Sequence, residues 1–267
     1  DATRAARCCR SVDYFPVERR ALFSAGEIVQ ETVQYANDFS IEYHKTYKVL
    51  RNLKMGGVFV LHQCGTPTTL AGLPADAVNA TVFTVPIQRW STGSTIPISF
   101  GEEIGVGTKL VHNDMTYTTS ACAQKRVGCG MQNHTAPSWG SAYLDPIYQS
   151  GSQLHFTDAW ATAATQTGID VAFDASSDPG MLARVEWVKF VAAFFNLEAR
   201  ANTVFQEIEG RFQATAAAVT SATLAGATKP RTAFVSYTAA SSWSSESWKV
   251  AATPYLMEAA QTAGGMY

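Results

Sequence analysis

The sequence predicts an α/β fold, and two stretches of the chain carry this prediction. Between residues 81 and 112 a strand-like segment, a polar turn, a short helix-like piece and a second strand follow one another, as in α/β units. Residues 179–219 are rich in good helix formers, with Pro179 near the start, and predict one helix about 50 to 60 Å long. Because one compact lobe does not need so long a helix, we expect it to connect two lobes.

The composition is that of a folded globular protein. Of the 267 residues, 46% are hydrophobic and 16% are charged, which is enough apolar material for a buried core. The 20 Lys and Arg against 22 Asp and Glu leave a formal net charge of −2, so the chain offers no basic surface to nucleic acid or an anionic membrane. No apolar run approaches the roughly 20 residues that span a bilayer. We therefore expect no binding of nucleic acid. We also expect the protein to be a monomer.

The remaining elements follow in chain order. Alternating apolar and polar residues, or short apolar runs bounded by turn residues, predict strands at residues 39–53, 58–64, 81–87, 109–112 and 232–237. Residues 116–152 are rich in Gly, Ser, Thr and Asn and are typical of long loops. A last helix is expected from about residue 248 to 263, and with the strand before it this helix opens a second lobe.

Cysteines and sequons indicate the compartment. None of the five cysteines has the paired spacing of a zinc site, and Cys122 and Cys129 are spaced for a short disulfide-closed loop. Asn79 and Asn133 each begin an Asn-x-Thr sequon and are candidate glycosylation sites. The chain starts without Met or an apolar segment, as a processed amino terminus does. Together these features predict a protein that is secreted or displayed on the cell surface through the secretory pathway.

Several segments carry a family resemblance over residues 28–267. FSIEYHKTYKVL at 39–50, VFVLHQCGTP at 58–67 and TVFTVPIQRWSTGSTIP at 81–97 precede the most specific match, residues 171–205, and KPRTAFVSY at 229–237 follows it. The chain thereby resembles the class III substrate-binding proteins, which capture cobalamin, ferric siderophores and haem for uptake. The sequons and extra cysteines make it most similar to the algal, cobalamin-binding members.

The resemblance implies a two-lobed class III periplasmic-binding-protein-like fold with a long interlobe helix. Its parts would be an amino-terminal extension at 1–27, a first lobe at 28–178, the interlobe helix at 179–222 and an incomplete second lobe at 228–267. It further implies capture of cobalamin (vitamin B12) in the interlobe cleft, without catalysis or a catalytic cofactor. The expected partner is a membrane transporter or receptor.

Ligands of open α/β sheets bind at the carboxyl ends of strands, which points to particular loops. A corrin edge needs aromatic planes and its amides need hydrogen-bonding groups. The loop after the strand at residue 90 offers both, and the second lobe places aromatic residues around one loop. The predicted ligand-binding residues are Trp90, Ser91, Thr92, Ser94, Thr95, Tyr117, Trp139, Tyr237, Trp243 and Trp248.

Other interpretations of the same residues remain open. Trp90 is equally typical of a core aromatic beside a helix-capping Ser/Thr run, and Trp248 of the first buried residue of the last helix. Only Arg89 and Lys249 lie close to the aromatics in sequence, which favours a neutral ligand over an anionic ferric siderophore, haem or iron chelate. A scaffolding or adhesion module without a small ligand is the third possibility.

Catalysis is not needed to explain the sequence. The motifs G-x-S-x-G, G-x-x-x-x-G-K-[ST] and H-E-x-x-H are missing. The five histidines have no spacing that would place two on one helix face, so we predict no metal site in the protein itself.

Overall fold

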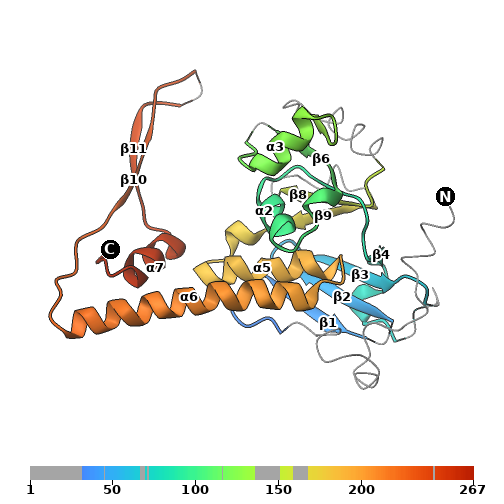
Figure 1. The fold of residues 1–267 in the computed structure, drawn as a ribbon, viewed down its shortest axis with the longest axis horizontal. Helices are drawn as coiled ribbons and strands as arrows, with labels where there is room; N and C mark the ends of the chain where they lie inside the picture. The colour runs from blue at the N-terminus through green and yellow to red at the C-terminus, as the bar shows by residue number, and fades with distance from the viewer. Residues whose placement is uncertain are drawn as a thin grey trace.

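The computed structural model describes residues 32–44, 46–66, 70, 72–115, 117–135, 151–158, 168–242 and 244–267. In this part of the chain two sheets enclose helix α5 (Met181–Ala193), and helix α6 (Glu198–Leu224) leads away from them to a hairpin and a last helix (Figure 1). The predicted α/β fold is confirmed. No helix of the described part is both long and apolar enough to cross a bilayer.

The first sheet has the strand order β1-β2-β3-β4, with antiparallel pairs except between β3 and β4, which are parallel. Its strands are β1 (Phe39–Tyr43), β2 (Tyr47–Asn52), β3 (Gly57–Gln63) and β4 (Thr81–Val85), with the short helix η2 (Ala75–Ala77) before the last. The strand predicted at 39–53 is therefore two strands joined by a turn. The strands predicted at 58–64 and 81–87 correspond to β3 and β4.

The second sheet is entirely parallel, in the order β7-β6-β5-β8-β9. Its elements are β5 (Trp90–Thr92), α2 (Ile96–Glu103), η3 (Gly107–Lys109), β6 (Leu110–Asp114), α3 (Ala121–Gly128), β7 (Asn133–Thr135), β8 (Leu154–Asp158), β9 (Asp170–Phe173) and η6 (Ala175–Ser177). The prediction of long loops at 116–152 is wrong where α3 and β7 lie. Helix α3 buries only Ala123 and β7 has three residues, so neither leaves a strong apolar pattern in the sequence.

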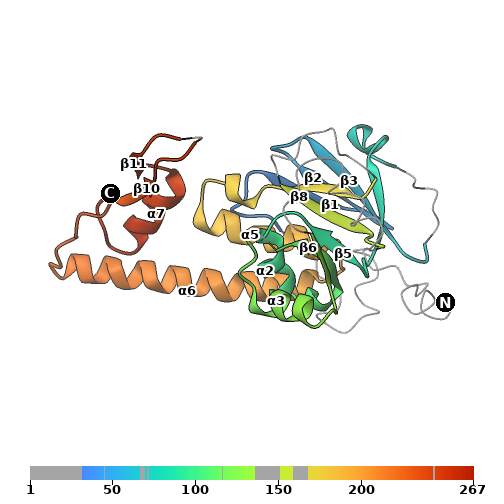
Figure 2. The same cartoon turned by 90° about the horizontal axis from the view of Figure 1, so that it is seen from above.

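The prediction of one continuous helix from residue 179 is also wrong. Helix α5 ends at Ala193, the chain reverses over residues 194–197, and α6 returns alongside α5. Asn196 adopts a left-handed conformation with φ 56°, which Asn tolerates better than most residues and which ends helices. The helix that leads away from the two sheets is α6 alone, and its buried side chains all lie in its first two turns. Figure 2 shows it passing beyond both sheets.

Beyond α6 the chain forms the antiparallel hairpin β10 (Phe234–Thr238) and β11 (Ser247–Ala251), followed by α7 (Pro254–Thr262). The last helix thus begins six residues later than predicted. Its expected first residue, Trp248, is a strand residue opposite Tyr237. The interpretation of Trp248 as a buried helix residue is therefore wrong.

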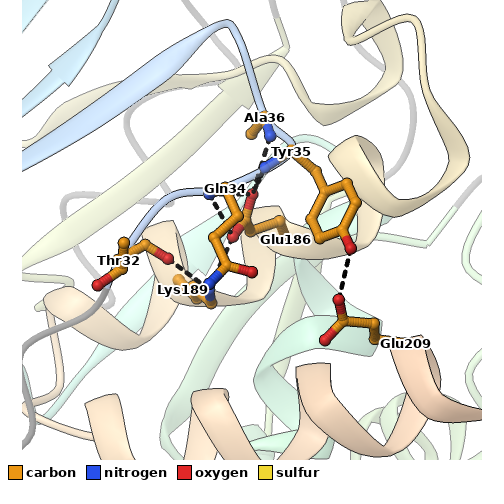
Figure 3. A network of polar contacts seen from close by, with 7 residues as sticks. All are labelled: Thr32, Gln34, Tyr35, Ala36, Glu186, Lys189 and Glu209. Atoms are coloured by element: carbon orange, nitrogen blue, oxygen red, sulfur yellow. Dashed lines mark hydrogen bonds and ion pairs between the residues drawn. The ribbon is translucent and has the colours of Figure 1, made fainter.

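Two polar side chains on the inner helix α5 hold the segment that enters the first sheet (Figure 3). The Glu186 carboxylate accepts the backbone N–H groups of Gln34, Tyr35 and Ala36 at 2.7 to 3.1 Å. Lys189 Nζ donates to Glu186 at 2.7 Å and to the carbonyl of residue 32 at 2.7 Å. Both charges are thereby paired and hydrogen-bonded, as buried charges must be.

A second buried ion pair fixes the reversal between α5 and α6. Lys48, on β2, is fully buried and forms an ion pair with Glu198, the first residue of α6. Its ammonium group also donates to the Ala193 carbonyl at 2.6 Å and to Asn196 Oδ1 at 3.0 Å. The first sheet therefore determines where α5 stops and α6 starts.

Replacing Lys48 by Met should lower the free energy of unfolding by about 3 to 5 kcal/mol, because the Glu198 carboxylate is left buried without a cation. Urea unfolding measures the change. The double variant Lys48→Met/Glu198→Leu should recover much of the loss. Arg51→Met, which breaks surface ion pairs with the exposed carboxylates of Glu42 and Asp76, is the matched control and should cost less than about 1 kcal/mol for each pair. Equal losses in the two single variants would contradict this.

Candidate ligand-binding site

The carboxyl edge of the second sheet has the geometry of an α/β ligand site. From β5 the chain proceeds outward to β6 and β7, and then returns to the other side of β5 as β8. The connections therefore diverge between β5 and β8, and open α/β sheets bind ligands at such a point. Residues 93–95 follow β5 at this point, and residues 115–118 follow the neighbouring strand β6, whereas residues 159–167 after β8 lie outside the described part of the chain. We call the described residues of these two loops the sheet edge.

Hydrogen bonds hold the first loop in a fixed shape. The Gly93 N–H donates to the carbonyl of Phe156 on β8 at 2.9 Å. The Thr92 hydroxyl accepts the Ser94 N–H at 3.0 Å and donates to the Ser94 carbonyl at 2.7 Å. Thr95 precedes α2, is half-buried, and its hydroxyl makes no capping hydrogen bond. Ser94 is almost fully buried, so Thr95 is the polar side chain that this loop presents.

The second loop presents an aromatic side chain. Tyr117 is 79% exposed, although its neighbour Thr118 is buried. The Thr118 hydroxyl donates to the Asp114 carbonyl at 2.6 Å and accepts a hydrogen bond from Asn113 Nδ2 at 3.0 Å. Because Thr118 is held in place, Tyr117 stands exposed beside a fixed residue.

Three predicted ligand-binding residues are instead part of the core. Trp90 is 0% exposed, and its indole N–H donates to the Val106 carbonyl at 3.0 Å. Its ring fills the space over Gly101, where an added Cβ would lie 2.6 Å from the ring. Ser91 and Thr92 are fully buried and hydrogen-bonded within the protein. Their assignment to ligand binding is wrong, and the interpretation of Trp90 as a core aromatic is confirmed.

The hairpin carries four apolar side chains on one face. Val235 faces Val250 and Tyr237 faces Trp248 across the two strands, and each is at least half exposed. The Tyr237 and Trp248 rings lie 4.8 Å apart between centroids, and Trp248 is 70% exposed. We call these four residues the hairpin face. In Figure 1 the hairpin and the second sheet stand on the same side of α6. Of the other predicted aromatics, Trp139 and Trp243 lie outside the described residues.

The two surfaces carry little charge. Among the described residues, the sheet edge has no charged side chain, and Asp114 lies just before its second loop. Arg89 precedes β5 and so lies at the amino end of that strand, where its Nε donates to the Gly151 carbonyl at 3.2 Å. Lys249 alternates with Trp248 along β11 and points to the other side of the hairpin. The two cations that are near the aromatics in sequence are therefore separated from them in the structure.

A buried polar row lies within the same sheet. Ser91 pairs with His112 on β6 and with His155 on β8, and its hydroxyl contacts His155 Nδ1 at 2.8 Å. Burial lowers the pKa of His155 from 6.5 to about 3, and His112 adds a smaller effect in the same direction. Both imidazoles are fully enclosed, so they support the sheet and do not reach a ligand. In the described part of the chain, no three His, Cys, Asp or Glu side chains are grouped to hold a metal ion.

The predicted disulfide between Cys122 and Cys129 is wrong. Both thiols are free and exposed. Cys122 lies in the first turn of α3 and Cys129 just after its last residue, so they are separated by about 10 Å of helix, beyond the reach of a disulfide. Cys64 is disulfide-bonded. Of the sequon residues, Asn79 is exposed in the turn before β4, and Asn133 begins β7.

Comparison with known proteins finds similarity only among solved structures: no protein-family model matches the sequence, and no curated protein is similar to it. A periplasmic binding protein from Veillonella parvula is 12% identical, with 68% of this chain and 58% of that one covered and a TM-score of 0.49. An ABC-type Fe3+-hydroxamate transport system from Saccharomonospora viridis is 16% identical, with 51% and 52% covered and a TM-score of 0.39. A periplasmic heme binding protein from Pseudomonas aeruginosa is 13% identical, with 56% and 52% covered and a TM-score of 0.36. The chain spans between 52% and 58% of the length of these structures.

Trp90→Ala should lower the free energy of unfolding by about 3 to 5 kcal/mol, because it empties a large volume in the core. Thermal or urea unfolding measures this loss. Gly101→Ala is the companion variant. Its methyl group would collide with the Trp90 ring, so it should lower the free energy of unfolding, and this loss should be smaller in the Trp90→Phe background. A Trp90→Ala protein as stable as the wild type would contradict the core assignment.

The free energy of unfolding should fall as the pH drops from about 6.5 towards about 3. In this window the unfolded chain binds a proton at residue 155 that the folded protein does not, which gives a slope of up to about 1.4 kcal/mol per pH unit. Urea unfolding at a series of pH values should show a shallower slope for His155→Gln. His44→Gln serves as the control, since that side chain is 24% exposed. An unchanged slope in His155→Gln would refute the assignment.

Proposed function

We propose that this protein is an extracellular binding protein that holds cobalamin between the sheet edge and the hairpin face for cellular uptake, without a catalytic step. The observation that carries the proposal is the exposure of Tyr117, Tyr237 and Trp248 on two separate parts of the fold. Exposed aromatics grouped with other apolar side chains are typical of binding surfaces.

The chemistry of the two surfaces suits a large ligand with an apolar plane and a rim of amides. The hairpin face offers aromatic rings and two valines, while Thr95 and the backbone groups at the start of α2 can hydrogen-bond to amides. A ferric siderophore or haem carries anionic groups that favour Arg or Lys. The described residues of the sheet edge include neither, which favours the neutral ligand over this alternative on the same fold.

The compartment and the partner belong to the same proposal. The disulfide at Cys64 and the exposed sequon at Asn79 support passage through an oxidising secretory pathway to the cell surface. We infer that a membrane transporter or receptor takes over the ligand at the cell surface.

Isothermal titration calorimetry of the full protein tests the ligand class. Cyanocobalamin, haem and a ferric hydroxamate are titrated separately under the same conditions. Saturable one-to-one binding of cyanocobalamin alone is expected. Binding of an iron ligand in its place would overturn the cobalamin assignment, and no binding of any of the three would favour a scaffolding module.

Trp248→Ala should weaken cyanocobalamin binding by about 1 to 3 kcal/mol, the scale of a buried aromatic contact. Since Tyr237 and Trp248 touch, the double alanine variant should lose less than the sum of the single losses. Leu224→Ala is the control: it removes a side chain that is 84% exposed on α6, outside both surfaces. If Trp248→Ala and Leu224→Ala bind equally well, the hairpin face is not part of the site.

A further inference from the structure

Helix α7 supplies a hydrogen-bond acceptor that the start of α5 lacks. Helix α5 begins at Met181, and the residue before it, Gly180, has no side chain that could cap the helix. The first N–H groups of a helix have no partner within the helix. The Glu258 carboxylate of α7 accepts the Met181 N–H at 2.7 Å. Its negative charge is favourable at the positive end of the helix, so Glu258 acts as a cap from another part of the fold.

A second contact between the same helices lies one turn along α5. The Arg184 guanidinium lies 4.0 Å from the centroid of the Tyr255 ring, in the geometry of a cation–π interaction. Arg184 Nε also donates to the Asp178 carbonyl at 2.7 Å, which orients the guanidinium. The two contacts together fix α7 in position and in rotation against the first lobe.

The covalent connection, by contrast, does little to orient this part of the chain. Residues 225–230 join α6 to the hairpin, are exposed throughout, and include Gly226 with φ 92°. Just after α7, Gly264 lies against the Val219 side chain of α6. Noncovalent contacts with α5 and α6 must therefore hold the unit formed by residues 231–267, and those with α5 are the polar ones described above.

We propose that Glu258 and Tyr255 form a latch that sets the orientation of the 231–267 unit on the first lobe. When the latch opens, the unit pivots about residues 225–230. The latch thereby sets the distance between the hairpin face and the sheet edge. Only this last consequence, for the ligand, rests on the proposed function.

Single-molecule Förster resonance energy transfer (FRET) on the full chain measures the distance between the 231–267 unit and the first lobe, and this distance changes with the orientation of the unit. The fluorophores are attached through non-canonical amino acids at Lys125 on α3 and Lys249 on β11, both exposed. The wild type should give one narrow distribution of transfer efficiency, and Glu258→Ala a broad or two-peaked one. Hydrogen exchange of the Met181 amide should become roughly 10-fold to 100-fold faster, since a charged acceptor is lost. Glu246→Ala, which removes an exposed carboxylate beside β11, should behave as the wild type in both measurements.

Two further variants separate the latch from simple helix capping. Gly180→Ser/Glu258→Ala gives α5 its own cap, so it should restore slow exchange at Met181 while the distribution stays broad. Tyr255→Leu keeps an apolar side chain and leaves Glu258 intact, and it should broaden the distribution to a lesser extent. Narrow, wild-type distributions in both Glu258→Ala and Tyr255→Leu would overturn the proposal. No measurement in this set includes cobalamin, so a failure of the proposed function would leave its outcome unchanged.

Discussion

The burial of most of helix α5 is the constraint on which the rest of the structure depends. Its buried side chains lie on every side of the helix, and such a helix is stable only when it is enclosed. At its carboxyl end the Phe194 ring meets Phe59 and Phe83 of the first sheet and Phe156 of the second, at centroid distances of 5.3 to 6.5 Å. Neither sheet alone could cover the helix, so the two sheets form one core around it.

The polar groups on and around α5 then determine where distant segments attach. Glu258 caps its amino end, Glu186 and Lys189 hold the segment that enters β1, and Lys48 fixes the reversal after its carboxyl end. Because the Lys48, Glu186 and Lys189 side chains are buried, losing these partners would leave a buried charge unpaired, so the attachments tolerate little variation. The orientation of α6, and with it the place of the hairpin, follows from these contacts.

Three strands of the two sheets could be predicted from the sequence, since β3 is a short apolar run, β4 alternates apolar and polar residues, and β6 follows a turn and a short helix as in an α/β unit. The identity of the site residues could not. Trp90 precedes a polar loop, as a ligand-binding aromatic would, but a central parallel strand is buried on both faces, so its position in sequence does not distinguish core from site. The pairing of Tyr237 with Trp248 depends on the hairpin register, which places two residues eleven positions apart on one face. The exposure of Tyr117 depends on the hydrogen bonds that hold Thr118.

The sequence by itself determined the α/β class, the long helix that leads out of the first lobe, and the low charge of the loops around the candidate site, because these follow from composition and local periodicity. Only the tertiary structure decided that the helix breaks at Asn196, that Arg89 lies at the opposite end of its strand from the sheet edge, and that Glu258 caps α5. The break at Asn196 and the cap by Glu258 depend on hydrogen bonds between groups more than 60 positions apart. The place of Arg89 relative to the sheet edge depends on the direction of β5. Such contacts form only when the sheets have closed on α5, and no local pattern of residues records them.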